Sequence, residues 1–200
     1  GLGAIKGVGE VAASKIIESR KADGRFETFA DFCERCGSDV NSRMLEHLTR
    51  AGALDGLGLR RSQILAIAEP MMEFAKVRAA ERAAGQASLF DLLDEADAGE
   101  VCSVPIPDIP EFDQEEILKS EKELLGFYVT GHPLDYCAEL VRAYASVPLR
   151  DLDKLNDNAQ VRLTGMVGSF TQKFSKNSGK QFGILQLEDL DSSAECMIYE

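Results

Sequence analysis

A tight glycine turn placed directly before an apolar helix is the feature that most constrains this chain. The turn reads Lys6-Gly7-Val8-Gly9, and Val8, Ala12 and Ile16 recur every four residues through the run that follows. That spacing predicts a helix with one buried face, and the glycines allow positive φ and a close approach by another molecule. Because the first N–H groups of a helix have no acceptor within it, they point outward with a partial positive charge. An anion such as a phosphate is the natural occupant of that position.

The turn and the two apolar residues before it, Leu2 and Ile5, resemble the helix-hairpin-helix, a module that grips nucleic-acid backbones without reading their sequence. On this interpretation main-chain N–H groups of the turn bind duplex phosphates, Val8 is the tip, and flanking lysines add charge. The predicted ligands are Lys6, Gly7, Val8, Gly9 and Lys15. The alternative is a plain helical corner with no ligand, because a glycine-apolar-glycine turn is not specific to phosphate.

A second helical pair is predicted further along. Helices are expected over residues 28–36 and 42–51, each opened by a side chain that caps helices well. The glycine-bearing turn at residues 53–58 then precedes a helix that begins near Arg60. This turn lacks the compact Gly-x-Gly form, which leaves its contact with phosphate open. Arg60 and Arg61, at its exit, are candidate DNA ligands.

Aromatic and sulfur side chains in this region are expected to form a core. Phe26, Phe29 and Phe32 recur every three residues, which favours packing over a platform for stacking bases. Cys33 and Cys36 form a Cys-x-x-Cys pair in the same predicted helix, and the sequence has no second Cys/His pair nearby. Buried thiols are therefore favoured over half of a zinc site.

Charge is distributed unevenly along the chain, whose formal net charge is −12. Residues 1–62 carry ten basic and nine acidic side chains, whereas residues 69–139 carry five basic and seventeen acidic ones. Residues 160–182 contain four basic residues and no acidic one. Since an acidic surface repels nucleic acid, any contact with it is expected at the two ends of the chain.

Length and composition set the class of protein. The 200 residues, 44% of them apolar, suit one large domain or two small ones. The sequence shows no run of about 18 apolar residues and no basic-then-apolar leader, which predicts a protein that neither spans a membrane nor is secreted. The five cysteines are odd in number and scattered. This usage indicates reduced thiols and a cytoplasmic location.

The sharpest short motif is Gln86-Ala87-Ser88-Leu89-Phe90. It resembles the pentapeptide with which bacterial replication proteins dock on the sliding clamp. Leu89 and Phe90 are adjacent large apolar side chains suited to a hydrophobic pocket, and Gln86 supplies a directional hydrogen bond. Ser88 completes the predicted clamp-binding set, whereas Ala87 departs from the commoner leucine. The alternative is a local apolar plug that packs on its own helices.

The segment that follows the motif, residues 91–116, is acidic and holds three closely spaced prolines, which predicts an extended linker or a loop draped over a neighbouring part of the protein. Helices are expected over residues 114–125 and 135–145. His132 lies between them in a Gly-His-Pro sequence, where a structural role in a turn is favoured over a catalytic one.

From residue 159 the apolar pattern changes to a period of two. Strands are predicted from residue 159, over residues 181–188 and over residues 194–199, with a basic hairpin turn after the first. This order is how an OB-fold barrel begins. Aromatic and basic side chains alternate here as single-stranded nucleic acid requires. The predicted single-strand ligands are Phe170, Lys173, Phe174, Lys176, Lys180 and Phe182.

Taken in order, several motifs together resemble one family. They are Gly1–Ser19, Phe29-Ala-Asp-Phe-Cys-Glu-Arg, Ala51-Gly-Ala-Leu-Asp, Gln86–Phe90 and Leu125-Gly-Phe-Tyr-Val-Thr-Gly-His-Pro-Leu-Asp. The chain is similar to the alpha subunits of bacterial DNA polymerase III, the C-family replicative polymerases, which extend a primer during chromosome replication. The resemblance spans essentially the whole chain and implies a C-terminal fragment of such a subunit.

The resemblance implies an α+β, multi-domain arrangement. Residues 1–84 would form a tandem helix-hairpin-helix domain on duplex DNA, and residues 85–113 a clamp-binding segment with its acidic linker. Residues 114–156 would form a helical connector, and residues 157–200 the first strands of an OB domain on single-stranded template. The implied partners are primer–template duplex, single-stranded template, the sliding clamp and other replicase subunits, with no membrane.

The resemblance also implies that bond formation happens elsewhere. Phosphoryl transfer needs carboxylates that hold two Mg²⁺ ions, and in this family they lie in a palm upstream of Gly1. The nearest aspartate pairs here, in residues 151–153 and 189–191, are predicted to lie in turns. We therefore expect no catalytic residue, no metal and no cofactor in this stretch, and no polymerase activity from it alone.

Two other classes remain open at this point. One is a protein-interaction scaffold whose hairpins are purely structural. The other is a repair enzyme that combines a helix-hairpin-helix with an OB domain, such as a ligase. The ligase interpretation requires an adenylation lysine motif or zinc cysteines, and the sequence shows neither.

Overall fold

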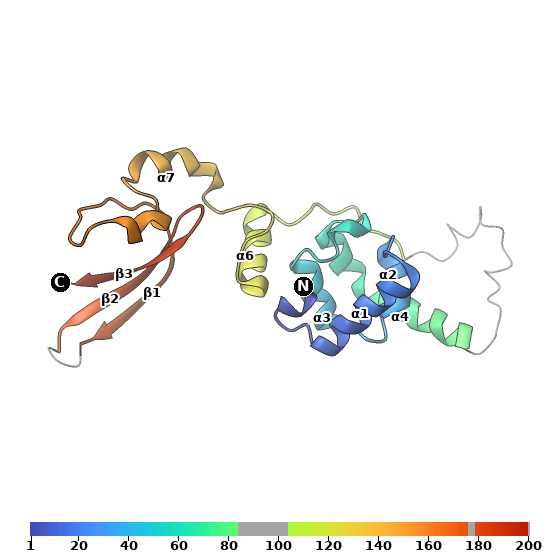
Figure 1. Cartoon of the computed structure of the whole chain (residues 1–200). Helices are drawn as coiled ribbons and strands as arrows, with labels where there is room; N and C mark the ends of the chain where they lie inside the picture. The colour runs from blue at the N-terminus through green and yellow to red at the C-terminus, as the bar shows by residue number, and fades with distance from the viewer. Residues whose placement is uncertain (84–103, 176–178, 200) are drawn as a thin grey trace. The chain divides into compact units, whose positions relative to one another are not determined.

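The computed structural model describes residues 1–83, 104–175 and 179–199, and the predicted clamp motif lies outside them. The chain divides into two compact units, Gly1–Thr130 and Gly131–Glu200 (Figure 1). The first unit is helical, and the second carries an antiparallel sheet, as expected for an α+β chain. Among the helices described, none is long and apolar enough to cross a membrane.

The first unit packs helices around one core. Its helical elements are η1 (Leu2–Ala4), α1 (Glu10–Asp23), α2 (Phe29–Cys36), α3 (Ser42–Arg50), η2 (Asp55–Leu57), α4 (Arg61–Ala83) and α6 (Gln114–Leu125). The α2 helix begins where the Thr28 hydroxyl accepts a hydrogen bond from the Asp31 amide at 3.1 Å. The α3 helix begins likewise at Asn41, whose side chain accepts from the Met44 amide at 2.8 Å. Both caps satisfy an N–H group that the helix itself leaves open.

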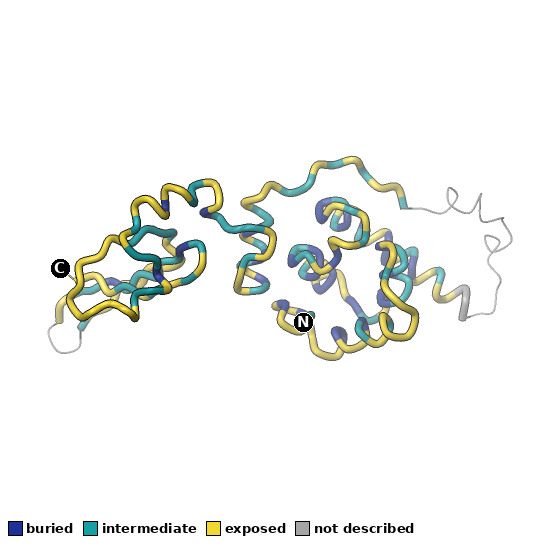
Figure 2. Tube along the Cα trace, turned by 45° about the horizontal axis from the view of Figure 1, so that its top comes forward, coloured by how far each residue is buried: buried dark blue, intermediate teal, exposed yellow. Residues whose placement is uncertain are grey.

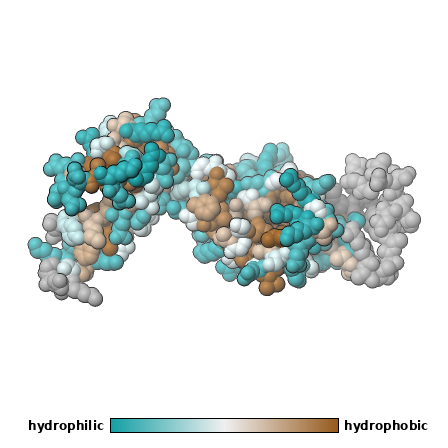
Figure 3. Space-filling model, in the orientation of Figure 1, coloured by the Kyte–Doolittle hydropathy of each residue, from teal (hydrophilic) through white to brown (hydrophobic). Residues whose placement is uncertain are grey.

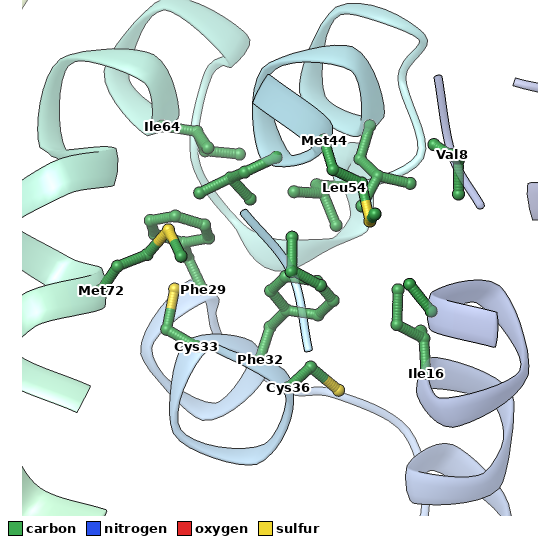
Figure 4. Packing of buried hydrophobic residues seen from close by; sticks show 14 of the residues in the cluster. Val8, Ile16, Phe29, Phe32, Cys33, Cys36, Met44, Leu54, Ile64 and Met72 are labelled. Atoms are coloured by element: carbon green, nitrogen blue, oxygen red, sulfur yellow. The ribbon is translucent and has the colours of Figure 1, made fainter. Parts of the chain in front are cut away.

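The core confirms the expected role of the aromatic and sulfur side chains. Phe29, Phe32, Cys33 and Cys36 are each at most 2% exposed, and they lie together between the helices (Figure 4). Phe26 packs edge-on against Phe32, with ring centroids 5.2 Å apart. Burial raises the pKa of the Cys33 thiol to about 12, so this thiol stays protonated and behaves as a small apolar group.

The α6 helix belongs to the first unit. Its Leu124 is buried in the same core as Phe29 and Phe32, and α6 packs against α3. The structure therefore groups residues 114–125 with the hairpins, whereas the sequence favoured a separate connector over residues 114–156. A short amphipathic helix buries its apolar face against a neighbouring element, and for α6 that element is α3.

The second unit is built on a three-stranded sheet in the order β1-β2-β3. Its elements are η4 (Asp135–Cys137), α7 (Ala138–Tyr144), η5 (Leu149–Lys154), β1 (Met166–Phe174), β2 (Gln181–Glu188) and β3 (Ser193–Tyr199). The first strand begins at Met166, later than the pattern predicted. Before it, the Arg162 carbonyl oxygen accepts from the Ser146 amide at 2.9 Å, and the Arg162 amide donates to the Ser146 hydroxyl at 2.8 Å.

Burial differs between the two units (Figure 2). In the first unit buried positions gather on the inward sides of the helices, whereas most of β1 and β3 is exposed. Asp189 is buried at the turn between β2 and β3, where it accepts hydrogen bonds from the amides of Leu149 at 2.8 Å and Ser192 at 2.8 Å. That carboxylate ties the start of η5 to the sheet.

Candidate nucleic-acid interface

The first glycine turn joins η1 to α1 and presents two open amides. Gly9 is the N-cap of α1, and no side chain caps that helix. Gly7 has φ +83°, a conformation that favours glycine. In the part of the chain that the structure describes, the Gly7 and Gly9 N–H groups donate to no acceptor. The start of α1 therefore offers N–H donors and the positive end of its dipole to an anion.

Val8 was expected to bind phosphate at the tip, and the structure corrects this. Its amide donates to the Ile5 carbonyl oxygen at 3.0 Å, and its side chain is 7% exposed within the core cluster (Figure 4). An N–H group that already has a partner adds nothing to phosphate binding. Val8 instead anchors the turn to the core, so that the glycines on either side are held in place.

His47, which was not among the residues predicted from the sequence, contacts the turn. The Nδ1 atom of His47, on α3, lies 2.6 Å from the Lys6 carbonyl oxygen. A Cβ added at Gly7 would lie 2.5 Å from the same nitrogen, so the ring fills the space that a side chain would need. The sequence carries no signal for this contact, because residues 6 and 47 come together only when α3 packs beside the turn.

The C-terminal end of α6 also contacts the turn. The Lys6 amide donates to the Leu124 carbonyl oxygen at 2.9 Å, and the Lys6 ammonium lies 3.7 Å from the Glu123 carboxylate. Lys15, on α1, pairs with Asp39. Both lysine side chains are more than half exposed, at 67% and 52%. Surface ion pairs of this kind contribute about 0–1 kcal/mol, so a phosphate can compete for either lysine.

Arg61 was predicted to bind DNA, and the structure corrects this too. Its side chain is 5% exposed, and the guanidinium donates to both Asp55 oxygens at 2.8 and 2.7 Å and to Glu121 at 3.1 and 3.2 Å. The hydrogen bond to Asp55 raises the pKa of Arg61. With its donors engaged and the group buried, Arg61 holds α4, η2 and α6 together. The Arg61 guanidinium also lies close to Gly52. A Cβ added at residue 52 would lie 2.4 Å from Nη2, so this position has no room for a larger side chain.

Arg60 is half exposed but already engaged. Its guanidinium donates to Asp108 at 3.2 Å and to the Ile109 carbonyl oxygen at 2.8 Å. Next to it, the Glu111 carboxylate accepts from the Arg61 amide at 2.7 Å and from the Ser62 amide at 3.0 Å. The N-terminus of α4 therefore already holds an anion, which belongs to the chain itself.

The pKa of Glu111 reflects this position. Burial by itself raises the pKa of a carboxyl group, but the amides of Phe112, Ser62 and Arg61 all donate to it, and the pKa of Glu111 is lowered overall. Glu111 is thus bound as a carboxylate. Nothing in its sequence context marks it as a cap, since it lies fifty residues from the helix it caps.

The predicted single-strand ligands divide between the two faces of the sheet. Phe170 pairs with Leu185 and Phe174 with Gln181, whereas Lys173 pairs with Phe182. Because directly paired residues share a face and neighbours along a strand alternate, Phe170 and Phe174 lie on one face and Lys173 and Phe182 on the other. These four side chains therefore do not form one platform.

Tyr199 joins the face that carries Lys173 and Phe182. Its ring stacks on Phe182 with centroids 5.9 Å apart, and it is 68% exposed. Met197, 54% exposed, lies on the same face. The opposite face holds Phe170 packed over Gly183, where an added Cβ would lie 2.6 Å from the ring. The surface of this unit mixes hydrophobic and hydrophilic groups (Figure 3).

Comparison with known proteins identifies the family. A family model described as a helix-hairpin-helix motif matches residues 1–64. The DNA polymerase III alpha subunit of Neisseria meningitidis serogroup B is 37% identical over 198 residues, which cover 98% of this chain and 16% of that protein. Those of Vibrio cholerae and Helicobacter pylori are each 35% identical, over 201 and 204 residues, covering 100% of this chain and 17% of each protein. The chain is homologous to one segment of the DNA polymerase III alpha subunit.

The helix-hairpin-helix match includes both glycine-bearing turns, but their N–H groups have different partners in the structure. The first leaves the amides of Gly7 and Gly9 open, and the second has its helix start filled by Glu111. Some predicted ligands lie outside the described residues, namely Gln86, Ser88, Leu89, Phe90 and Lys176.

Asp151, Asp189, Asp191 and the His132 amide make local contacts. Asp189 caps a turn, Asp191 pairs with Arg150 at 2.7 Å, and Asp151 pairs with Lys154 at 2.6 Å. The His132 amide donates to Asp135 at 2.6 Å. None of these contacts brings carboxylates together at an open site.

Proposed function

We propose that this chain is a DNA-holding part of a DNA polymerase III alpha subunit, and that it grips the phosphates of primer–template duplex with its first hairpin. The observation that carries the proposal is the pair of open amides at Gly7 and Gly9 beside the uncapped start of α1. The helix-hairpin-helix match over residues 1–64 and the relatives named DNA polymerase III alpha support it. Contacts of this kind position DNA without reading its sequence.

Gly9 allows a sharp test of this proposal. Its φ of −69° and ψ of 147° are open to any residue, and an added Cβ would meet nothing within 4 Å. The fold therefore does not need a glycine here, whereas a phosphate bound against the backbone does need the space. Gly3 is the matched control, because a Cβ added there also meets nothing within 4 Å.

The experiment measures duplex affinity by fluorescence anisotropy across a salt series. We expect Gly9→Ala to weaken binding about tenfold while thermal stability stays unchanged, as loss of one or two charge-assisted hydrogen bonds predicts. Gly3→Ala should bind as the wild type does. Equal affinities for both variants would refute phosphate binding at this turn.

The sheet face with Lys173, Phe182 and Tyr199 is the surface we assign to single-stranded template. Stacked aromatic rings beside a lysine suit unpaired bases and their phosphates, and the Phe182 and Tyr199 rings stack with an interplanar angle of 24°. The opposite face is richer in apolar side chains, including Phe170, Leu185 and Ile198, and suits the interior of a barrel that further strands would close. The OB fold itself is part of this proposal.

Clamp binding rests on the sequence of residues 86–90 alone. We assign Gln86, Leu89 and Phe90 as anchors, with Ser88 between them. A Leu89→Ala/Phe90→Ala double variant that still bound the sliding clamp would remove this assignment. Primer extension, with its Mg²⁺ ions and its other replicase partners, we assign to the whole alpha subunit, of which this chain matches 16–17%.

A further inference from the structure

Residues 104–113 contact the second hairpin, and several of them accept hydrogen bonds from it. We call residues 104–113 the return segment. Its Pro107 carbonyl oxygen accepts from the Gln63 side chain at 3.0 Å, and its Asp108 and Ile109 accept from the Arg60 guanidinium at 3.2 and 2.8 Å. Glu111 then accepts from the amides of Arg61 and Ser62 at 2.7 and 3.0 Å.

Three of these acceptors engage donors that a phosphate could use, namely Asp108 and Ile109 at Arg60 and Glu111 at the α4 amides. A phosphate at the start of α4 would take its hydrogen bonds from the amides that Glu111 occupies. It would take its charge from Arg60, which Asp108 and Ile109 occupy. The remaining arginine, Arg61, is buried against Asp55 and Glu121. The second hairpin thus has the donors that bind an anion, and the Glu111 carboxylate of the same chain already occupies them.

The first hairpin shows the contrast within the same unit. The start of α1 has Gly9 as its N-cap with no side-chain partner, whereas the amides at the start of α4 donate to Glu111. A carboxylate cap stabilises a short helix more than a long one, yet here the cap is on the longer helix, α4, and not on α1. The difference therefore suggests that the two hairpins do not bind DNA equally.

We propose that the return segment is an internal substitute for DNA, which closes the second hairpin so that the duplex is held by the first and not by the second. This inference rests on the duplex binding proposed above. A groove of about 580 Å³ beside the contact, lined by residues that include Gly58, Arg60, Asp108 and Glu111, leaves room for a phosphate once the carboxylate is gone. Acidic competition of this kind also sets which part of a basic surface meets DNA.

The test compares two single-charge variants of the whole chain. Glu111→Ala removes the carboxylate from the α4 start, and Glu115→Ala removes an exposed carboxylate four residues later. Both raise the net charge by one, so a general electrostatic effect is the same in each. We expect Glu111→Ala to steepen the salt dependence of duplex binding by about 0.9, the value for one added phosphate contact, and Glu115→Ala to leave it unchanged. Equal slopes for the two variants would overturn the proposal.

Arg60 supplies a second measurement that leaves the α4 cap intact. As a single substitution, Arg60→Ala should leave duplex affinity unchanged, because the return segment already binds the Arg60 guanidinium. Asp108→Asn should strengthen binding about threefold, a gain typical of one exposed charge, and Asp108→Asn/Arg60→Ala should abolish that gain. A loss of affinity in Arg60→Ala, or no gain in Asp108→Asn, contradicts the proposal even if Glu111→Ala fails to fold.

The outcomes separate this inference from the proposed function. If Gly9→Ala weakens duplex binding but Glu111→Ala and Glu115→Ala behave alike, the first hairpin binds DNA and only the role of the return segment is refuted. If the wild type binds no duplex, or Gly9→Ala binds it as the wild type does, the proposed function itself is refuted.

Discussion

The buried carboxylate of Glu121 accepts two hydrogen bonds from the Arg61 guanidinium, at 3.1 and 3.2 Å, although the two residues are sixty positions apart. Its other oxygen accepts from the amides of Val129 and Thr130 at 2.7 and 3.0 Å. One fully buried group thus joins the start of α4 to α6 and to the residues that end the first unit. The hairpin domain and α6 are held as one body by this contact.

Removing the charge of Glu121 should therefore destabilise the first unit. Asp55 would still pair with Arg61, but the glutamine NH2 group would face N–H donors of Arg61 or of Val129 and Thr130 in a buried site. We therefore expect Glu121→Gln to lower the free energy of unfolding by about 3 kcal/mol. The control is Glu123→Gln on the same helix, whose side chain is 66% exposed. We expect that change to stay within about 0.5 kcal/mol. Urea unfolding followed by circular dichroism measures both, and equal midpoints would contradict the assignment.

Acid should weaken the same unit. Burial raises the pKa of Glu121, but hydrogen bonds from Thr130, Val129 and Arg61 outweigh it, so the pKa is lowered in the fold; that of Glu111 is lowered as well. The unfolded chain, with carboxyl pKa values of about 4.3, then takes up protons at higher pH than the folded chain. Stability should be full above about pH 5 and fall as the pH drops through the lowered folded values. Glu121→Gln should flatten this dependence, and an unchanged slope would contradict its origin.

Single-stranded DNA should distinguish the two faces of the sheet. We expect Phe182→Ala or Tyr199→Ala to weaken binding of an oligothymidylate by about 1–3 kcal/mol, as loss of one stacked base predicts. Phe174→Ala, on the opposite face, is the control, although Phe174 is itself 69% exposed. If exposure rather than the face decided binding, Phe174→Ala would lose affinity as well. Anisotropy at fixed salt measures all three.

Alkylation should sort the thiols by burial. Cys33 and Cys36 are each 1% exposed, and burial raises the pKa of both, that of Cys33 to about 12. Since the thiolate is the reactive form, neither should react with iodoacetamide at pH 8 in the folded protein. Cys137, which is half-buried, should react, and urea should expose the other two. Peptide mass mapping checks this, and rapid labelling of Cys33 without urea would contradict the core packing.

Local features of the fold were predictable because they depend on neighbours in sequence. Thr28 and Asn41 cap helices through amides three residues away, and the spacing of Phe29 and Phe32 set their side of a helix. Contacts made across the unit were not predictable. Arg61 and Glu111 lie in sequence contexts that suggest exposure, and only the packing of α4 beside the return segment engages them.

The sheet shows the same limit at shorter range. Alternation along β1 places Phe170 and Phe174 on one face, and that much follows from their spacing. Whether Phe182 joins them depends on the register of β1 against β2, which pairs it with Lys173 instead. A register one residue different would have reversed the result.

By itself the sequence determined the helical hairpins, their caps, the aromatic core, the alternating strands and the kinship with DNA polymerase III alpha subunits, since each depends on short spacing or on ordered motifs. The tertiary structure decided which amides stay open, which arginines remain free for phosphate and which face of the sheet gathers the rings. These depend on charges and carbonyl groups that meet only after distant segments pack, because a buried or paired donor is unavailable whatever its sequence neighbours are.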